Sequence, residues 1–160
     1  IRMIDAGDVE AIDRAFRAGQ GDYVHLQGPA AQQLENEGIG HVVAAVGEVI
    51  GPVAFSSLCA SREWLTTDMA RTFLRAYRKA RARVIESPAA EIAALETSFF
   101  PTIDREVLTR TIADYQRLGC WAPAVDISRA SYETLLDVFE FNGLIRQRHP
   151  YELAVAPLPV

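Results

Sequence analysis

The expected fold is decided by residues 8–29, DVEAIDRAFRAGQGDYVHLQGP. Asp8 can cap a helix over residues 8–18, and Gly19 stands just past that helix, where a left-handed conformation needs no Cβ. Residues 23–27 then alternate in polarity as a strand does. The Gly28–Pro29 pair turns the chain into another helix over residues 29–36. The stretch therefore predicts half of an α/β repeat, and it carries no catalytic group.

Three further strands are predicted in the first part of the chain. They cover residues 1–4, the apolar run HVVAAV over 41–46, and PVAFSSLCA over 52–60. A glycine- and proline-containing turn over residues 47–52 separates the last two. Strands that alternate with short helices indicate a mostly parallel sheet. Cys59 would lie on the last strand as a buried free thiol.

The second part of the chain reads as helix. Ser61 begins a short turn, and Ser128 can cap the last helix. Longer helices are predicted from residue 67 or 68 to 86, over 88–99, from residue 102 or 104 to 118, and over 128–141, with a loop at 120–126 before the last one. Ser87 would be the N-cap of the second of these helices, with Pro88 in its first turn. We therefore divide the chain into an α/β portion, residues 1–54, and a crossover strand with a helical portion, residues 55–160.

Composition narrows the function classes. The 160 residues carry a net charge of −5, which argues against a general nucleic-acid-binding protein. Six basic residues cluster within residues 71–83, but they alternate with apolar ones, so we interpret them mainly as the solvated face of a helix. No apolar run reaches the length of a membrane span, and no signal peptide is visible in this sequence.

The residues that could carry catalysis are sparse. None of the three histidines, His25, His41 and His149, has a second ligand at a spacing typical of metal sites. The sequence has no P-loop, no GxGxxG and no GxSxG, and its acidic residues form no convincing acid–base pair. We therefore expect a binding protein without metal or cofactor rather than an enzyme.

The best candidate ligand site lies at the end of the predicted strand 23–27. Gln27, Gly28 and Pro29 stand at its carboxyl end, where ligands gather in open α/β sheets, and the helix that follows offers free amide groups. His25 would share a strand face with Gln27. Phe55 and Ser56 form a second candidate, able to stack on a ligand and to hydrogen-bond it. The alternatives are an ordinary strand-to-helix turn and an ordinary core phenylalanine.

Several segments resemble one family in their order and spacing. They are the AGQGDY turn at residues 18–23, the tripeptide QGP at 27–29, AFSSLCAS at 54–61, FLRAY at 73–77, and SYETLLDVFEFNGLI at 131–145. Together they resemble solute-binding proteins of ABC importers, in the branch that binds aliphatic sulfonates, taurine, nitrate or pyrimidine precursors of thiamine. The resemblance covers nearly the whole chain. It departs at Gln27 and Gly28, where that branch has a W-E-P-like tripeptide.

The resemblance implies a partial class II periplasmic-binding-protein-like α/β fold, namely the end of a second lobe and a helical return to the first. It further implies reversible binding of a small polar or anionic molecule in an interlobe cleft, by Gln27, Gly28, Pro29, His25, Phe55 and Ser56. An ABC permease would be the partner, and the location would be periplasmic or lipid-anchored outside the cytoplasm. As half of such a protein, the chain could form homo-oligomers. Two alternatives stay open: a ligand-sensing regulatory domain, and an enzyme related to pyrimidine-precursor synthesis.

Overall fold

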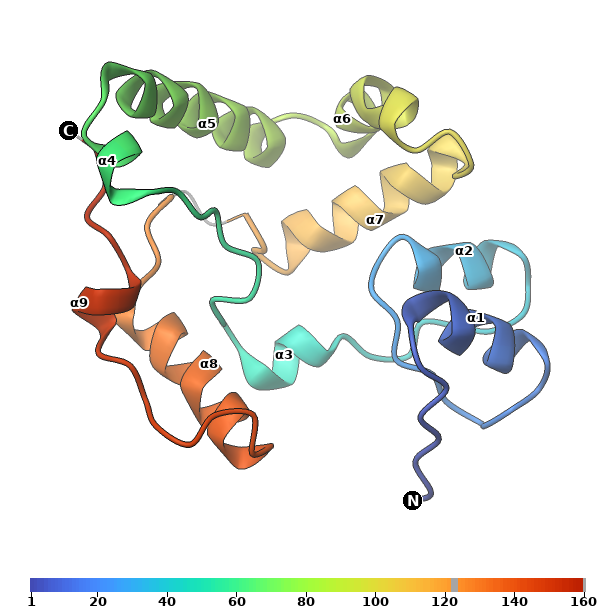
Figure 1. Ribbon diagram of the computed structural model, residues 1–160. Coiled ribbons are helices and arrows are strands. Elements are labelled where there is room, and N and C mark those ends of the chain that lie inside the picture. Colours follow the sequence, from blue (N-terminus) through green and yellow to red (C-terminus); the bar gives the residue numbers. More distant parts are fainter. Residues whose placement is uncertain (122–123, 160) are drawn as a thin grey trace. The chain divides into compact units, whose positions relative to one another are not determined.

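The computed structural model describes residues 1–121 and 124–159, which contain helices and no strand (Figure 1). The elements in chain order are α1 Val9–Arg17, α2 Ala30–Asn36, α3 Val46–Ile50, α4 Arg62–Leu65, α5 Asp68–Glu86, α6 Ala89–Glu96, the 3₁₀ helix η1 Thr97–Phe99, α7 Arg105–Arg117, α8 Arg129–Phe141 and α9 Tyr151–Ala154.

The predicted helix starts at Asp8 and Ser128 are confirmed by their capping bonds, and so is the predicted cap at Ser61, which begins the short helix α4 rather than a turn. The side chain of Asp8 accepts a hydrogen bond from the amide of Ala11 at 2.8 Å. Ser61 accepts one from Trp64 and Ser128 one from Ser131, both at 3.1 Å. Each cap satisfies an amide that a helix leaves without an internal partner. At α6 the prediction was one residue early, because Pro88 and not Ser87 is the capping residue.

The predicted α/β, periplasmic-binding-protein-like fold class is wrong for the described residues. The four predicted strands, 1–4, 23–27, 41–46 and 52–60, form no ladder, and α3 occupies part of the expected turn at 47–52. A strand is stabilised by pairing with a neighbouring strand, so a strand-like pattern shows that a segment can pair but does not supply its partner. Cys59 is exposed in this irregular chain, not buried.

Parts of the sequence pattern persist without a sheet. Val24 and Leu26 are half-buried, whereas Tyr23, His25 and Gln27 are exposed, so the alternation expected of a strand is retained in an extended segment. The predicted loop over 120–126 includes residues 122 and 123, which lie outside the described residues.

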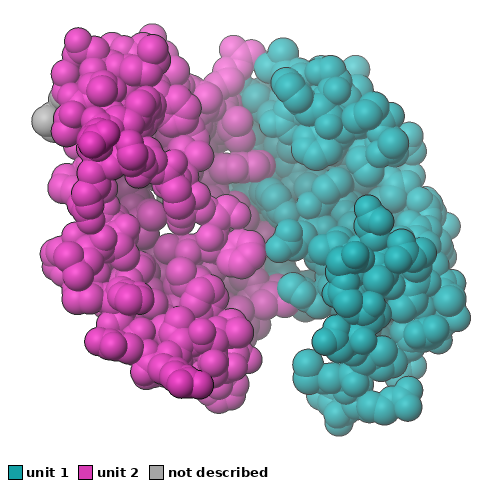
Figure 2. All heavy atoms as spheres, in the orientation of Figure 1, with its two compact units in different colours: residues 1–45, 87–117 teal, residues 46–86, 118–160 magenta. Residues whose placement is uncertain are grey.

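The structure divides into two compact units, coloured in Figure 2: unit 1 comprises residues 1–45 and 87–117, and unit 2 comprises 46–86 and 118–160. The sequence-based division at residue 54 stays a prediction. In unit 1, α2 and α6 both pack against α7. Its core consists of the buried side chains Leu34, Ile92, Ala93, Val107, Leu108 and Ile112. Three of them, Val107, Leu108 and Ile112, recur at helical spacing on one side of α7.

Unit 2 holds its last segment against α8. The hydroxyl of Tyr132 donates to the carbonyl of His149 at 2.9 Å, and the rings of Tyr132 and Tyr151 form a T-shaped pair with 5.6 Å between centroids. Arg148 reaches the carboxylates of Asp137 and Glu140 on α8, each at 2.6 Å. Residues 148–151 are thereby tied to one helix by both apolar and charged contacts.

Within unit 1, Arg17 at the end of α1 forms an ion pair with Glu37, the residue that ends α2. Hydrogen bonds from Arg17 and then Gln33 hold the pKa of Glu37 below its ordinary value. We expect Arg17→Gln to raise that pKa toward the ordinary value, as measured by an NMR titration of the side-chain carboxyl. Since the folded-state pKa is depressed, the stabilisation is present above the unfolded-state pKa and is lost as pH falls through the folded-state pKa.

The matched control for this titration is Arg14→Gln. Arg14 faces Glu10 on the same helix, at 3.7 Å. This control removes an arginine from α1 without touching Glu37, so the pKa of Glu37 should not move. An equal change in both variants would show that Glu37 responds to overall charge and not to its pairing with Arg17.

Candidate functional site

The candidate site begins at a tight turn between the extended segment 23–27 and α2. The amide of Ala30 donates to the carbonyl of Gln27 at 3.1 Å, and the peptide bond between Gly28 and Pro29 is cis. Pro29 is the N-cap of α2 and makes no side-chain capping bond. A cis proline at the third position of a four-residue turn is the arrangement of type VI turns.

The turn rests on a polar seam where α2 packs against α7. The side-chain amide of Gln32 donates to the carboxylate of Asp114 at 3.2 Å, and the Thr111 hydroxyl donates to the carbonyl of Val107 at 2.9 Å. Gln32 and Thr111 are each only 7% exposed. Hydrogen-bonded polar side chains therefore line the contact between α2 and α7, and one buried atom there, Oε1 of Gln32, has no hydrogen-bond partner among the described residues.

Gly28 lies closest to this seam. A Cβ atom at position 28 would lie 2.9 Å from Cγ2 of Thr111, 3.0 Å from the hydroxyl of Tyr115 and 3.1 Å from Oε1 of Gln32. Real Cβ contacts are essentially never shorter than 3.0 Å, so the backbone approaches α7 more closely than any side chain permits. The space beneath Gly28 is filled by protein, which leaves only the outer side of the turn to a ligand.

Sequence reasoning missed Gln32, Thr111 and Asp114. Thr111 was the available signal, because it stands four residues after Val107 and one before Ile112, among apolar residues at helical spacing. A polar side chain at such a position is buried against something that it can hydrogen-bond. The location of its neighbours on α2 required the structure.

The predicted site residues fall into two groups. His25 and Gln27 are exposed beside the turn, and Gly28 and Pro29 are half-buried within it, all in unit 1. Phe55 and Ser56 are exposed in unit 2, next to Ala54, whose amide donates to the carbonyl of Ser131 in α8 at 3.1 Å. The structure thus brings the residues of the first group together along one segment and assigns Phe55 and Ser56 to the other unit.

The start of α2 is a poor anion site. The helix has seven residues, so its macrodipole is small, and the first amide after Pro29 is already bonded to Gln27. The amide of Ala30, the first one after Pro29, is therefore already occupied and is not available to a ligand. Any ligand at this turn would depend mainly on the exposed side chains.

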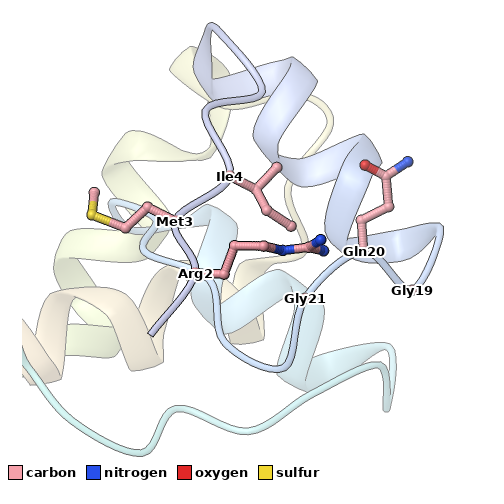
Figure 3. A pocket seen from close by; sticks show the side chains of 6 residues that line it. All are labelled: Arg2, Met3, Ile4, Gly19, Gln20 and Gly21. Atoms are coloured by element: carbon pink, nitrogen blue, oxygen red, sulfur yellow. The ribbon is translucent and has the colours of Figure 1, made fainter.

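A shallow open depression of about 610 Å³ lies elsewhere in unit 1 (Figure 3). It is lined by residues 2–4 of the N-terminal segment and by the turn after α1, residues 19–21. Figure 3 shows Arg2 and Ile4 directed toward that turn and Met3 directed away. None of the sequence-predicted site residues lines it.

The described residues hold neither a metal-binding cluster nor a membrane-spanning helix. No group of three or more histidine, cysteine, aspartate or glutamate side chains there is arranged to hold a metal ion. None of the described helices is both long enough and apolar enough to cross a membrane.

The chain is similar to one protein whose name points to binding. Over 157 residues it is 30% identical to "Putative binding protein YtlA" of Bacillus subtilis (strain 168). The alignment covers 97% of this chain but 47% of that protein, so the chain spans about half of its relative's length. No protein-family profile and no solved structure matches the chain. The similarity supports a binding function in general terms.

Proposed function

We propose that the chain belongs to the solute-binding component of an ABC importer and binds a small polar or anionic organic molecule reversibly. The observation that carries this proposal is the similarity to a binding protein over nearly the whole chain. The candidate ligand classes are those of the family that the sequence motifs resemble: sulfonates, nitrate, aromatic acids and pyrimidines. An ABC permease is the proposed partner, and the proposed location is outside the cytoplasm.

The turn at Gln27 supplies groups suited to such ligands. The Gln27 side chain is exposed and offers both a donor and an acceptor without a charge, and exposed His25 adds a group that can donate or accept. The backbone beneath them is fixed by the close contact of Gly28 with α7. A side chain carried on a rigid turn loses less freedom on binding, which favours affinity.

We expect Gln27→Ala to weaken ligand binding without lowering stability, because the side chain is exposed and the backbone bonds of the turn remain. A thermal-shift screen with taurine, nitrate, benzoate and an aminopyrimidine identifies the stabilising compound, since ligand binding to the folded state raises apparent stability. Isothermal titration with that compound then compares the variants. The loss of one uncharged hydrogen bond predicts an affinity about 2- to 10-fold lower.

The control variant is Gln147→Ala, which removes an exposed glutamine from unit 2. Its affinity should equal that of the unaltered chain. Equal affinity for Gln27→Ala and the unaltered chain would remove Gln27 from the site. Recovery of a chemically altered compound after incubation would contradict reversible binding and would favour an enzyme.

A further inference from the structure

Helix α5 differs in charge from the rest of the chain. Its 19 residues include six basic side chains and two acidic ones, Asp68 and Glu86. The remaining sequence has ten basic and nineteen acidic side chains. A strongly positive helix on an otherwise acidic protein is a local feature, because charges farther apart than about 8 Å are largely screened at physiological salt. The partner that α5 favours is therefore anionic.

Four of the six basic side chains of α5 share one face of the helix. One side of the helix carries Arg71, Arg75, Arg78 and Lys79. Apart from the adjacent pair Arg78 and Lys79, any two of them are three, four, seven or eight residues apart, which places them on the same side. We call Arg75, Arg78 and Lys79 the basic face; all three side chains are exposed. Arg71 is engaged by Asp68 at 2.6 Å and contributes less positive charge.

Exposed apolar side chains accompany the basic face. Met69 and Phe73, one turn apart on α5, are 65% and 45% exposed, whereas Ala70 and Leu74 on the next side are buried. One side of α5 is therefore buried, a second side is basic, and a third side carries exposed apolar side chains. Amphipathic helices with lysine or arginine on one face and large apolar side chains on another are typical of helices that lie in a membrane interface.

The aromatic side chains of this region favour a lipid surface over a nucleic acid. The centroid of the Phe73 ring lies 6.1 Å from that of Tyr77 in a stacked arrangement and 5.9 Å from that of Trp64 in a T-shaped one. Tyr77 also has the guanidinium of Arg81 over its ring, at 5.7 Å. Binding of single-stranded nucleic acid uses open aromatic faces on which bases stack. Here these rings already contact one another, while Met69 projects a flexible apolar side chain into solvent.

We propose that α5 docks the protein on an anionic phospholipid surface, with the basic face contacting the headgroups and Met69 reaching the interface. Each lysine or arginine near such a surface strengthens binding roughly fivefold. Three of them give an expected contribution of roughly a hundredfold to the partition coefficient. The docking is reversible and weakens as salt rises.

The test is sedimentation with vesicles of phosphatidylcholine alone and of phosphatidylcholine mixed with phosphatidylglycerol. The chain should sediment with the mixed vesicles and not with phosphatidylcholine alone. The triple variant Arg75→Gln, Arg78→Gln, Lys79→Gln should lose roughly a hundredfold in partition coefficient. Glutamine keeps a helix propensity similar to that of arginine and lysine, so far-UV circular dichroism should be unchanged.

A matched control removes the same charge elsewhere. The triple variant Arg2→Gln, Arg14→Gln, Arg146→Gln changes three exposed arginines outside α5. It should bind mixed vesicles nearly as well as the unaltered chain. Equal losses in the two triple variants, or equal binding to both vesicle types, would overturn the proposal. Loss of binding to an oligothymidylate but not to vesicles in the α5 variant would replace the lipid surface with a nucleic acid.

Discussion

Leu108→Ala should lower the free energy of unfolding by about 2–5 kcal/mol, the range found when a buried leucine is truncated. Leu108 is 3% exposed, and its neighbours on α7, Val107 and Ile112, are also buried. Leu108 lies on α7, the helix that packs against both α2 and α6, so its truncation leaves a cavity in the core of unit 1. Urea unfolding followed by far-UV circular dichroism measures the loss, and an unchanged m-value shows that the compactness of the end states is preserved.

The matched control is Leu95→Ala on the neighbouring helix α6. Leu95 is the same residue type, but it is 61% exposed, so its truncation should change stability by no more than about 0.5 kcal/mol. Similar losses for the two variants would contradict the assignment of Leu108 to the core of unit 1. If Leu95→Ala lowered the free energy of unfolding more than Leu108→Ala does, Leu95 would lie on the buried face of α6.

The helices could be predicted from the sequence because their signals are local. The carboxylate of Asp8 and the hydroxyls of Ser61 and Ser128 bond to amides three residues away, so the residues that mark each start also stabilise it. Gly143, with a φ of 68°, ends α8 where the sequence indicates. These interactions need nothing from the rest of the chain.

The strands could not be predicted with equal safety, because strand formation depends on distant partners. The run HVVAAV has the β-branched residues that favour strands, yet Val42 and Val43 are exposed in irregular chain. Similar propensity at residues 52–60 leaves Phe55 67% exposed. The pattern of side chains indicates which segments could form strands. A strand forms only where a second strand lies close enough to pair with it.

The candidate site shows the same division between local and distant information. The turn at Gln27, Gly28 and Pro29 could be predicted, since glycine and proline mark turns for reasons of their own backbone geometry. That Gly28 lies against Thr111, more than eighty residues away in the sequence, could not be predicted. The polar seam between α2 and α7 depends on which helices pack together, and one sequence does not contain that information in readable form.

Gly28→Ala should destabilise the chain by about 1–3 kcal/mol, the usual cost of forcing an extra methyl group into a packed site. The new Cβ would lie 2.9 Å from Cγ2 of Thr111 and 3.0 Å from the Tyr115 hydroxyl, so either the turn shifts away from α7 or these side chains move. A shift of the turn together with α2 would also lengthen the hydrogen bond between Gln32 and Asp114, which is already 3.2 Å. Urea unfolding measures the loss, and hydrogen exchange of the α2 amides should show faster local opening.

Two further variants separate this steric effect from the ordinary effect of replacing glycine. Gly47→Ala lies in α3, where a Cβ meets nothing within 4 Å, so it should be neutral or stabilising by up to about 1 kcal/mol. Thr111→Ser removes the Cγ2 methyl group, which is the nearest atom to the new Cβ. Combined with Gly28→Ala it should therefore restore part of the lost stability, and the double-mutant cycle should give a coupling of about 0.5 kcal/mol or more. Strict additivity of the two substitutions would mean that the turn does not bear on Thr111, and the rigid support proposed for Gln27 would fail with it.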